Sequence, residues 1–353
     1  MRPSVAAEQR PSLAIKQGAL HPKLIEISWQ RCREHGLAPN WQVSQAGLTR
    51  TTLRLQQEQN RQMRKLALRE MNLLERTLSN SGRILLLADR TGLILDSQGD
   101  GRFLDRAARV SLNPGASWSE LMAGTNAIGT ALVERRFIQV IGNQHFFCDN
   151  RFLACEAMPI FSPTGDLAGA LDISGHALDH GLPAASKLVR HAAAHIEHNW
   201  VEESAQDLLL RLHPHPSWLD TPEEGVLSFQ DDLLMGASSR GLAYLGLTSQ
   251  AIGRAHWDDL FEQKPRYGRQ ELQLRHAAGF CYANAARAST TAASMAAGER
   301  AHTGPETFRD LKQEALRRAV LQENGNITAA ARKLGINRST FYRQLGRTSP
   351  TDL

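Results

Sequence analysis

The sequence predicts a multidomain α+β protein: an antiparallel sheet with covering helices, a smaller sheet-containing domain, and an all-α helix-turn-helix toward the C-terminal end. Three observations support this fold class. The hydrophobic period changes from helical to strand-like near residue 84, short strand patterns recur between residues 225 and 285, and the last stretch returns to a helical period. A length of 353 residues with 42% hydrophobic content is sufficient for two or three domains with their own cores.

The N-terminal part of the chain is predicted to be helical after a disordered start. Residues 1–20 are polar and contain prolines, which favours disorder, and residues 21–80 form the helical region. A long amphipathic pattern in this region is typical either of a dimer seam or of a helix that lies on its own domain, and both alternatives remain open. Its apolar stripe consists of Met63, Ala67, Met71, Leu74 and Leu78.

Residues 81–212 are predicted to form the larger sheet domain. Residues 84–96 predict an antiparallel hairpin with a turn at Gly92, and three more strands are expected further along the chain. One helix is expected over residues 118–135 and a long one over residues 182–212, which ends the domain. The three later strands are expected at residues 137–142, 154–161 and 167–174.

A smaller module is predicted over residues 220–286, after a proline-rich break at residues 213–216. A segment rich in Ala, Ser and Thr, residues 287–304, is expected to be a flexible linker to the C-terminal module. The elements expected in the smaller module are strands at residues 225–229, 271–275 and 280–285 and a helix at residues 238–245.

The C-terminal module, residues 305–348, has the pattern of a helix-turn-helix. Small residues at 329–331 permit a first helix to pack closely, Gly335 supplies a tight turn, and the apolar residues of a second helix recur four apart. Between residues 325 and 347 there are five Lys or Arg and no Asp or Glu. This segment therefore presents one sign of charge to a polyanion.

The same segment resembles the C-terminal DNA-binding domain of the Fis family at Asn326, Thr328, Ala330, Gly335, Ile336, Asn337, Arg338, Thr340 and Leu345. In that family the second helix enters the major groove, and such domains read paired half-sites. The resemblance implies a homodimer whose partner is double-stranded DNA with a palindromic operator. It implies DNA contacts by Thr328, Arg332, Lys333, Asn337, Arg338, Ser339, Thr340, Tyr342, Arg343 and Arg347.

Two further segments resemble the acetoin-catabolism type of sigma-54 activator-like bacterial transcription regulator. The run Ser28-Trp29-Gln30-Arg31-Cys32 is similar to the opening of those proteins, and packing on a helix face is the expected role of its Trp and Cys. Residues 81–212 resemble the GAF sensor domain of the same class. That resemblance rests on the run from Gly124 to Leu132, His145, Pro159-Ile160, Gly165 and the strand from Gly169 to Gly175.

The GAF resemblance implies a small-molecule effector, because such domains hold a ligand between the sheet and its covering helices. Core packing is the favoured alternative for any single aromatic residue among the expected lining. The residues expected to line the site are His145, Phe146, Phe147, Cys148 and Phe152.

The region between the expected sensor domain and the helix-turn-helix differs from the corresponding region of the regulators that the chain resembles. Residues 220–286 resemble a degenerate PAS domain, to which no ligand is assigned, and only the linker follows before the C-terminal module. Regulators of the resembled class carry a central AAA+ ATPase domain, and a P-loop needs Gly-Lys followed by Ser or Thr. No lysine of this chain follows a glycine. The sequence therefore predicts a regulator that lacks this ATPase domain and does not remodel polymerase with ATP.

The sequence predicts no enzyme, no cofactor and no metal site. Cys148 and Cys155 near His145 are the candidates for a thiol site, and His191, His195 and His198 share one helix face. Neither set has the orienting third group or the ligand motif that such chemistry needs. The four cysteines form no Cys-x-x-Cys pair and are expected to be reduced.

The expected location is the cytoplasm, without a membrane partner, because the apolar stretches are too short to cross a bilayer and no signal-peptide core is present. The charge of +5 is modest, which argues against a general nucleic-acid binder. The prediction is a dimeric transcription regulator that senses a small molecule and binds specific DNA. The alternatives are an architectural DNA-binding protein with a vestigial sensor, and a thiol or metal enzyme that uses the sensor pocket.

Overall fold

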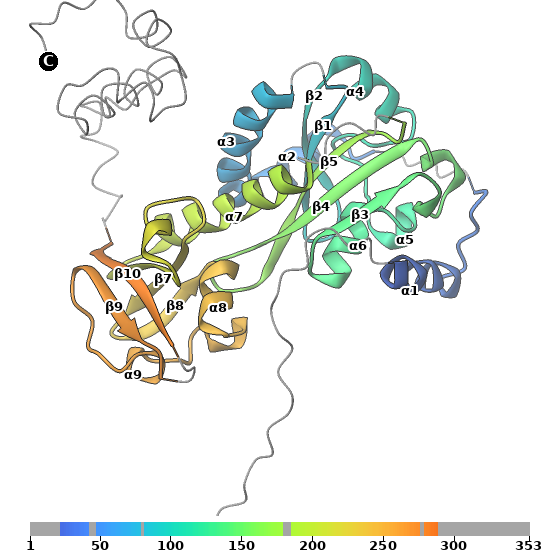
Figure 1. The fold of residues 1–353 in the computed structure, drawn as a ribbon. Helices are drawn as coiled ribbons and strands as arrows, with labels where there is room; N and C mark the ends of the chain where they lie inside the picture. Colours follow the sequence, from blue (N-terminus) through green and yellow to red (C-terminus); the bar gives the residue numbers. More distant parts are fainter. Residues whose placement is uncertain (1–21, 42–46, 79–80, 179–184, 276–278, 289–353) are drawn as a thin grey trace, which may run out of the picture. The chain divides into compact units, whose positions relative to one another are not determined.

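A computed structural model describes residues 22–41, 47–78, 81–178, 185–275 and 279–288. The chain divides into two compact units after Ser289, and all described residues belong to the first unit. This unit contains two five-stranded antiparallel sheets with helices packed on them (Figure 1). The predicted antiparallel sheet with covering helices and the predicted smaller sheet-containing module are confirmed, whereas the predicted C-terminal helix-turn-helix lies outside the described residues.

The first sheet has the spatial strand order β2-β1-β5-β4-β3, with every neighbouring pair antiparallel. The predicted hairpin is confirmed, and its turn contains Gly92 with a φ of 85°, a conformation that favours glycine. The three later strands also lie where the sequence predicts them. The bounds are β1 (Ile84–Asp89), β2 (Ile94–Gly99), β3 (Ile138–Ile141), β4 (Leu153–Phe161) and β5 (Leu167–His176).

Alternate side chains of this sheet face two different helix layers. On β1, Leu85 and Leu87 pack in one core cluster and Leu86 and Ala88 in another, as the two-residue period of a strand requires. Figure 1 shows α3 and α7 on one side of the sheet and α5 and α6 on the other. The first layer consists of α3 (Arg61–Leu78) and α7 (Ala185–Ser204), and the second of α4 (Gly101–Ala108), α5 (Glu120–Ala123) and α6 (Ala127–Glu134).

The apolar stripe of the N-terminal region covers the chain's own sheet. Met63, Ala67, Met71, Leu74 and Leu78 lie on α3, and none is more than 9% exposed. A dimer seam along this stripe is therefore the wrong alternative. The preceding helices are α1 (Pro22–Glu34) and α2 (Arg50–Gln59), and α2 contributes no buried side chain.

The continuous helix predicted over residues 118–135 is wrong, because the chain breaks between α5 and α6. Gly124 adopts a φ of 63°, and a Cβ at this position would lie 2.7 Å from the Cβ of Phe146. Asn126 then begins α6, since its side chain accepts a hydrogen bond from Gly129 N at 2.8 Å. The small residues that indicate close packing also produce the break.

The helix predicted to residue 212 is wrong beyond Ser204, where α7 ends. Residues Leu208–His213 form β6, the central strand of a second sheet with the order β8-β7-β6-β10-β9. The run Leu208-Leu209-Leu210 is apolar without interruption. Its periodicity alone therefore does not distinguish a buried strand from a buried helix.

The rest of the second sheet agrees with the predicted strands at residues 225–229, 271–275 and 280–285, and β8 is an additional strand. The helix predicted at residues 238–245 is present and ends at Gly246 in the left-handed conformation. The elements are β7 (Gly225–Gln230), β8 (Leu233–Ala237), α8 (Ser239–Leu245), α9 (Trp257–Leu260), β9 (Gly268–Gln273) and β10 (Phe280–Arg287). Short 3₁₀ helices lie at Gly142–Gln144, Cys148–Asn150, Pro216–Trp218 and Ser249–Ala251.

Helix α7 contacts elements of both sheets. The buried carboxylate of Glu197 accepts a hydrogen bond from Phe161 N, at the end of β4, and another from Ser239 N, at the start of α8, both at 3.0 Å. Burial raises the pKa of this carboxyl, while the two backbone donors oppose the rise. Glu197 therefore joins the first sheet to the second module.

Candidate functional site

Helix α1 is attached to the α5–α6 layer through a buried polar network. Ser28 is completely buried, and its hydroxyl donates to Glu120 Oε1 at 2.6 Å. The same hydroxyl lies 2.7 Å from the Thr125 hydroxyl and 3.2 Å from that of Thr130. A hydroxyl is able to donate once and accept twice, so Ser28 uses its full capacity at this position.

Arg31 completes the attachment of α1 with charge. Its guanidinium makes two hydrogen bonds of 2.8 Å to the Glu120 carboxylate and a third to Glu134 Oε1. Burial opposes ionisation of Glu120, but hydrogen bonds from Arg31, Ser28 and Thr130 outweigh it and lower the pKa of this carboxyl. The network therefore remains ionised, and α1 is fixed by directional contacts rather than by apolar packing alone.

The apolar side of α1 packs on the loop that follows β3. Cys32, Phe146 and Phe147 form one buried cluster, with Trp29 packed against it. The Trp29 ring lies edge-on to Phe146 at 5.1 Å between centroids, and its Nε1 donates to Gln144 O at 2.8 Å. Trp29 and Cys32 do pack a helix face, and Phe146 and Phe147 form core beneath α1.

His145 is buried beside these aromatic residues. Its Nδ1 donates to Gly142 O at 3.1 Å, so its Nε2 is left as an acceptor, and no described group lies within hydrogen-bond distance of that atom. Burial lowers the pKa of the imidazole to about 4. His145 is therefore neutral near pH 7. Among the described residues, neither of its ring nitrogens is hydrogen-bonded to Cys148 or Cys155.

The other two predicted lining residues lie in different surroundings. Cys148 is exposed in a short 3₁₀ helix. Phe152 is half-buried, with the Arg106 guanidinium 4.8 Å from its ring centroid and the His176 ring 6.1 Å away. Three of the five predicted residues are thus buried and two reach toward the surface, and effector contact by any of them stays a prediction.

Asp172 and Ser174 on β5 are site candidates that the sequence analysis did not single out. They follow Ala170 at two-residue intervals, which turns them toward the α6 layer. The Ser174 hydroxyl donates to Asp172 Oδ1 at 2.5 Å, and no described group is bonded to Oδ2. Burial raises the pKa of Asp172 to about 8. Polar residues at alternate positions of an otherwise apolar strand were the signal available in the sequence.

The three histidines of α7 each face a carboxylate. His195 Nδ1 lies 3.6 Å from Glu70 Oε1, and His198 Nε2 lies 3.2 Å from Glu202 Oε1. His191 reaches a carboxylate of the second module at 3.8 Å. Among the residues that the structure describes, His, Cys, Asp and Glu side chains do not gather in groups of three that would hold a metal ion.

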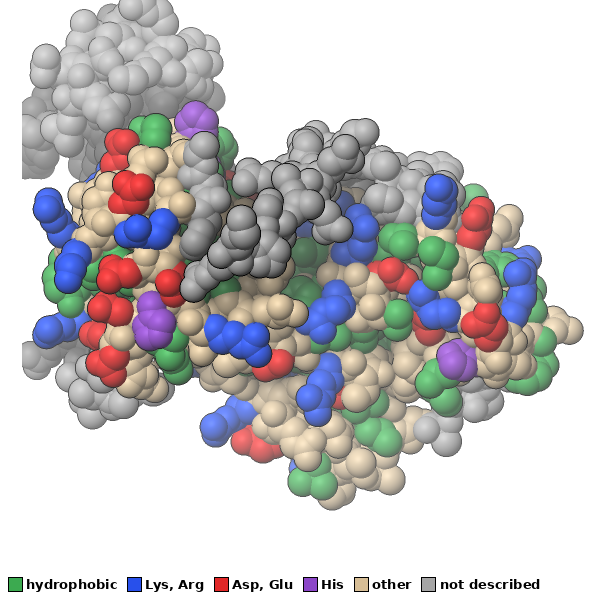
Figure 2. Space-filling model, turned by 90° about the horizontal axis from the view of Figure 1, so that it is seen from below, with side chains coloured by type: hydrophobic (Ala, Val, Ile, Leu, Met, Phe, Trp, Pro, Cys, Tyr) green, Lys and Arg blue, Asp and Glu red, His purple; other side chains and the backbone are tan. Residues whose placement is uncertain are grey.

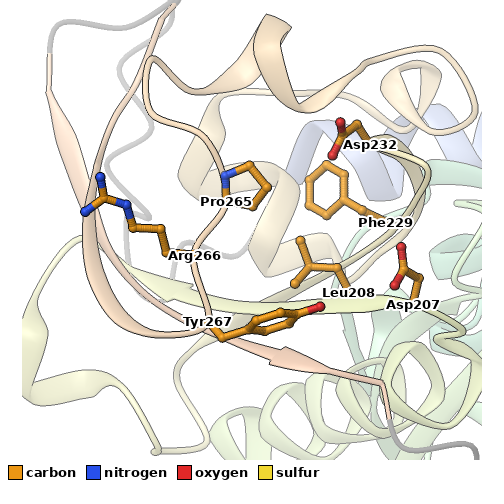
Figure 3. A pocket seen from close by; sticks show the side chains of 7 residues that line it. All are labelled: Asp207, Leu208, Phe229, Asp232, Pro265, Arg266 and Tyr267. Carbon is orange, nitrogen blue, oxygen red and sulfur yellow. The ribbon is translucent and has the colours of Figure 1, made fainter.

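Two open cavities lie outside these clusters. One, of about 340 Å³, lies between the start of α3, the β1–β2 turn and Trp200. The other, of about 170 Å³, lies in the second module, with Leu208 and Phe229 behind a rim of polar residues (Figure 3). No helix in the described ranges is both long enough and apolar enough to span a membrane.

Comparison with known families identifies two parts of the chain. Residues 4–198, more than half of the 353 residues, match the family described as "MimR, N-terminal domain". The chain belongs to that family. Residues 307–347 match the family "Bacterial regulatory protein, Fis family". The predicted Fis-type helix-turn-helix is thus supported by the comparison, although its residues lie outside the described ranges.

Two similar curated proteins are named as transcription regulators. The acetoin catabolism regulatory protein of Cupriavidus necator is 32% identical over 63% of this chain and 34% of its own length. The acetoin dehydrogenase operon activator AcoR of Bacillus subtilis is 32% identical over 45% of this chain and 27% of its own. The matched region is therefore about a third or less of either relative.

Two further comparisons give shorter or structural matches. The propane 2-monooxygenase operon activator MimR of Mycolicibacterium smegmatis is 34% identical over 25% of this chain and 17% of its own. The crystal structure of the E. coli DhaR(N)-DhaL complex contains a chain with a TM-score of 0.48 and 16% identity, covering 74% of this chain and 97% of that one.

The predicted DNA-contacting residues, from Thr328 to Arg347, all lie outside the described ranges. On the face shown in Figure 2, the described Lys and Arg side chains are interspersed with Asp and Glu. A surface of mixed sign attracts a polyanion less than a segment of one sign does. The charge on that face therefore does not favour a DNA-binding site there over the Fis-type segment.

Proposed function

We propose that this chain is a DNA-binding transcription regulator that senses a small-molecule effector in its first sheet domain. The observation that carries the proposal is the combination, in one chain, of a MimR N-terminal domain and a Fis-type domain. The relatives named above are regulators of acetoin and propane operons, which supports a catabolic operon as the target. The proposed role is that of a regulator and not of an enzyme, and its proposed location is the cytoplasm.

The proposed effector site lies between the first sheet and the α5–α6 layer, with α1 as its outer wall. Two buried polar atoms without described partners, His145 Nε2 and Asp172 Oδ2, support this position, because a bound ligand would satisfy them. The residues proposed to line the site are His145, Phe146, Phe147, Cys148 and Phe152, with Asp172 on the sheet.

The proposed output is a change in DNA affinity. Glu197 of α7 bonds β4 of the first sheet and the start of α8 in the second module, so we propose that a shift of the first sheet displaces the second module, from which the chain leads toward the Fis-type segment. We propose that two copies of the chain bind one palindromic operator. We also propose that the chain does not remodel polymerase with ATP, because no lysine of the chain follows a glycine as a P-loop requires.

Substitution of Arg338 in the Fis-type segment tests the DNA-binding role directly. Operator fragments selected from genomic DNA by the full chain serve as ligands. Arg338→Ala is expected to weaken specific binding by about 1–3 kcal/mol, because a base-reading arginine contributes that much. Arg254→Ala, an exposed arginine of the second module, is the matched control and should bind like wild type.

Equal operator affinity of the Arg338 variant and wild type would contradict this assignment. A salt titration separates the proposal from the architectural alternative. A specific regulator retains a large preference for the operator over random DNA as salt rises, whereas an architectural protein loses both affinities in parallel.

A further inference from the structure

The cavity in the second module joins an apolar floor to an acidic rim. Leu208 at the start of β6 and Phe229 near the end of β7 form the floor, and Phe229 is only 1% exposed. Asp207, Asp232 and Tyr267 stand at the rim, and the Arg266 side chain points away from the other lining residues (Figure 3). The net charge of the residues that line the cavity is therefore negative, with two carboxylates and one guanidinium.

Neither rim carboxylate makes a contact that stabilises the described part of the fold. Within the described residues, the carboxylates of Asp207 and Asp232 take part in no hydrogen bond or ion pair, and their backbone carbonyls make the structural contacts. Asp232 O accepts from Trp257 N at 2.7 Å, and Asp207 O accepts from Ala288 N at 2.6 Å. The backbone therefore holds both carboxylates in place while leaving their charge available.

The aromatic side chain at the rim is also available. Tyr267 is 62% exposed, and Figure 3 shows its ring crossing the mouth with the hydroxyl turned toward Leu208 and Asp207. An exposed aromatic face beside carboxylates attracts a cation through its quadrupole. The floor, the ring and the carboxylates thus favour one class of ligand, in which an apolar body carries a positive charge.

We propose that this cavity is a binding site for a small organic amine, separate from the effector site of the first sheet. The volume of about 170 Å³ is below the roughly 300–1,000 Å³ of sites for drug-sized ligands, so it suits one ring with a short ammonium arm. A metal ion fits less well, since Ca²⁺ takes about 6–8 oxygen ligands and the floor offers only carbon.

The cavity lies beside the residue at which the described part of the second module ends. Ala288 is the last described residue of the second module, and its N–H is bonded to the carbonyl of the rim residue Asp207. An amine at the rim would therefore lie beside the point at which the chain leaves β10. The binding test below does not depend on DNA binding.

The test compares three probes of one shape on the full chain: benzylamine, benzyl alcohol and benzoate. Saturation-transfer NMR and calorimetric titration should show benzylamine binding about tenfold tighter than benzyl alcohol, with benzoate weaker than both. Asp207→Asn and Asp232→Asn should each weaken the amine about two- to fivefold and leave the alcohol unchanged, because exposed ion pairs contribute that much. Asn tolerates the positive φ of Asp232, so the second variant retains the turn.

Asp258→Asn, an exposed aspartate on α9, is the matched control and should bind benzylamine like wild type. Equal affinity for benzylamine and benzoate would overturn the proposal. Absence of any benzylamine signal, or a double Asp207/Asp232 variant that binds the amine normally, would overturn it as well. Thermal denaturation of each variant shows whether a loss of binding comes from a loss of folding.

Discussion

At the scale of single residues, burial in the first sheet domain favours the neutral forms of His145 and Asp172. Burial lowers the pKa of His145 to about 4 from 6.5, and it raises that of Asp172 to about 8 from 3.8. Asp172 Oδ1 accepts the Ser174 hydroxyl, so the acid proton belongs on Oδ2, where it meets no described acceptor. An acceptor on a ligand would satisfy the Asp172 group, and a donor on a ligand would satisfy His145 Nε2.

The pKa of Asp172 predicts how stability depends on pH. A carboxyl whose pKa is higher in the folded than in the unfolded state contributes stability fully below pH 3.8 and loses it as pH rises through about 8. Asp172→Asn is neutral at every pH. From pH 5 to 8 the free energy of unfolding of wild type should fall relative to the variant, by at most about 1.4 kcal/mol per pH unit.

Urea denaturation at intervals across that range measures the difference. Asp96→Asn is the control, because Asp96 is ion-paired with Arg64 at the edge of the sheet and lies away from the interior. Curves for wild type and Asp172→Asn that run parallel from pH 5 to 8 would show that Asp172 is ionised in the folded protein.

At the scale of elements, α1 is the helix whose attachment the sequence predicted least well. The pattern indicated packing for Trp29 and Cys32, which the structure confirms. The pattern does not indicate that Ser28 and Arg31 bind Glu120. These two residues precede Glu120 in the sequence by 92 and 89 positions, respectively. Side-chain networks between distant segments leave no local periodicity, so a single sequence does not reveal them.

Removing the Ser28 hydroxyl should loosen α1. Ser28→Ala removes one donor from the buried Glu120 carboxylate and one contact from each of the Thr125 and Thr130 hydroxyls, which costs about 1–3 kcal/mol. Hydrogen exchange followed by mass spectrometry should show faster exchange in α1. Gln30→Ala, on the exposed side of the same helix, should leave exchange as in wild type. Unchanged protection of α1 in Ser28→Ala would mean that apolar packing alone fixes the helix.

Most strands of the first sheet were predictable because they alternate or stand between clear turns, as β1 and β2 do around Gly92. The two wrong helix predictions have local physical causes. The continuous leucines of β6 carry no period, and Gly124 both permits close packing and ends a helix. The candidate site was also predictable only in part. The buried aromatic residues were recognisable in the sequence as apolar residues. The proposed place of Asp172 in the site follows only from the strand register that pairs it with Leu86 and Ala157.

At the scale of the whole first unit, we expect α7 to make the two sheets unfold together. Glu197→Ala leaves the backbone N–H groups of Phe161 and Ser239 without their acceptor, and we expect a loss of about 2–3 kcal/mol. Calorimetry should then resolve two unfolding transitions where wild type shows one. Lys187→Ala, exposed on the same helix, should retain a single transition. A single transition at the wild-type temperature in Glu197→Ala would contradict this role.

The central claim is that a small molecule in the first sheet domain alters DNA binding by the Fis-type segment. The most direct measurement is the operator affinity of the full chain with and without a ligand found by thermal-shift screening. We expect a change of about 1–3 kcal/mol, with an equal reciprocal effect of DNA on ligand affinity. Phe152→Ala should weaken the ligand and leave basal operator affinity unchanged. A ligand that binds the first sheet domain tightly while operator affinity stays the same would contradict the account.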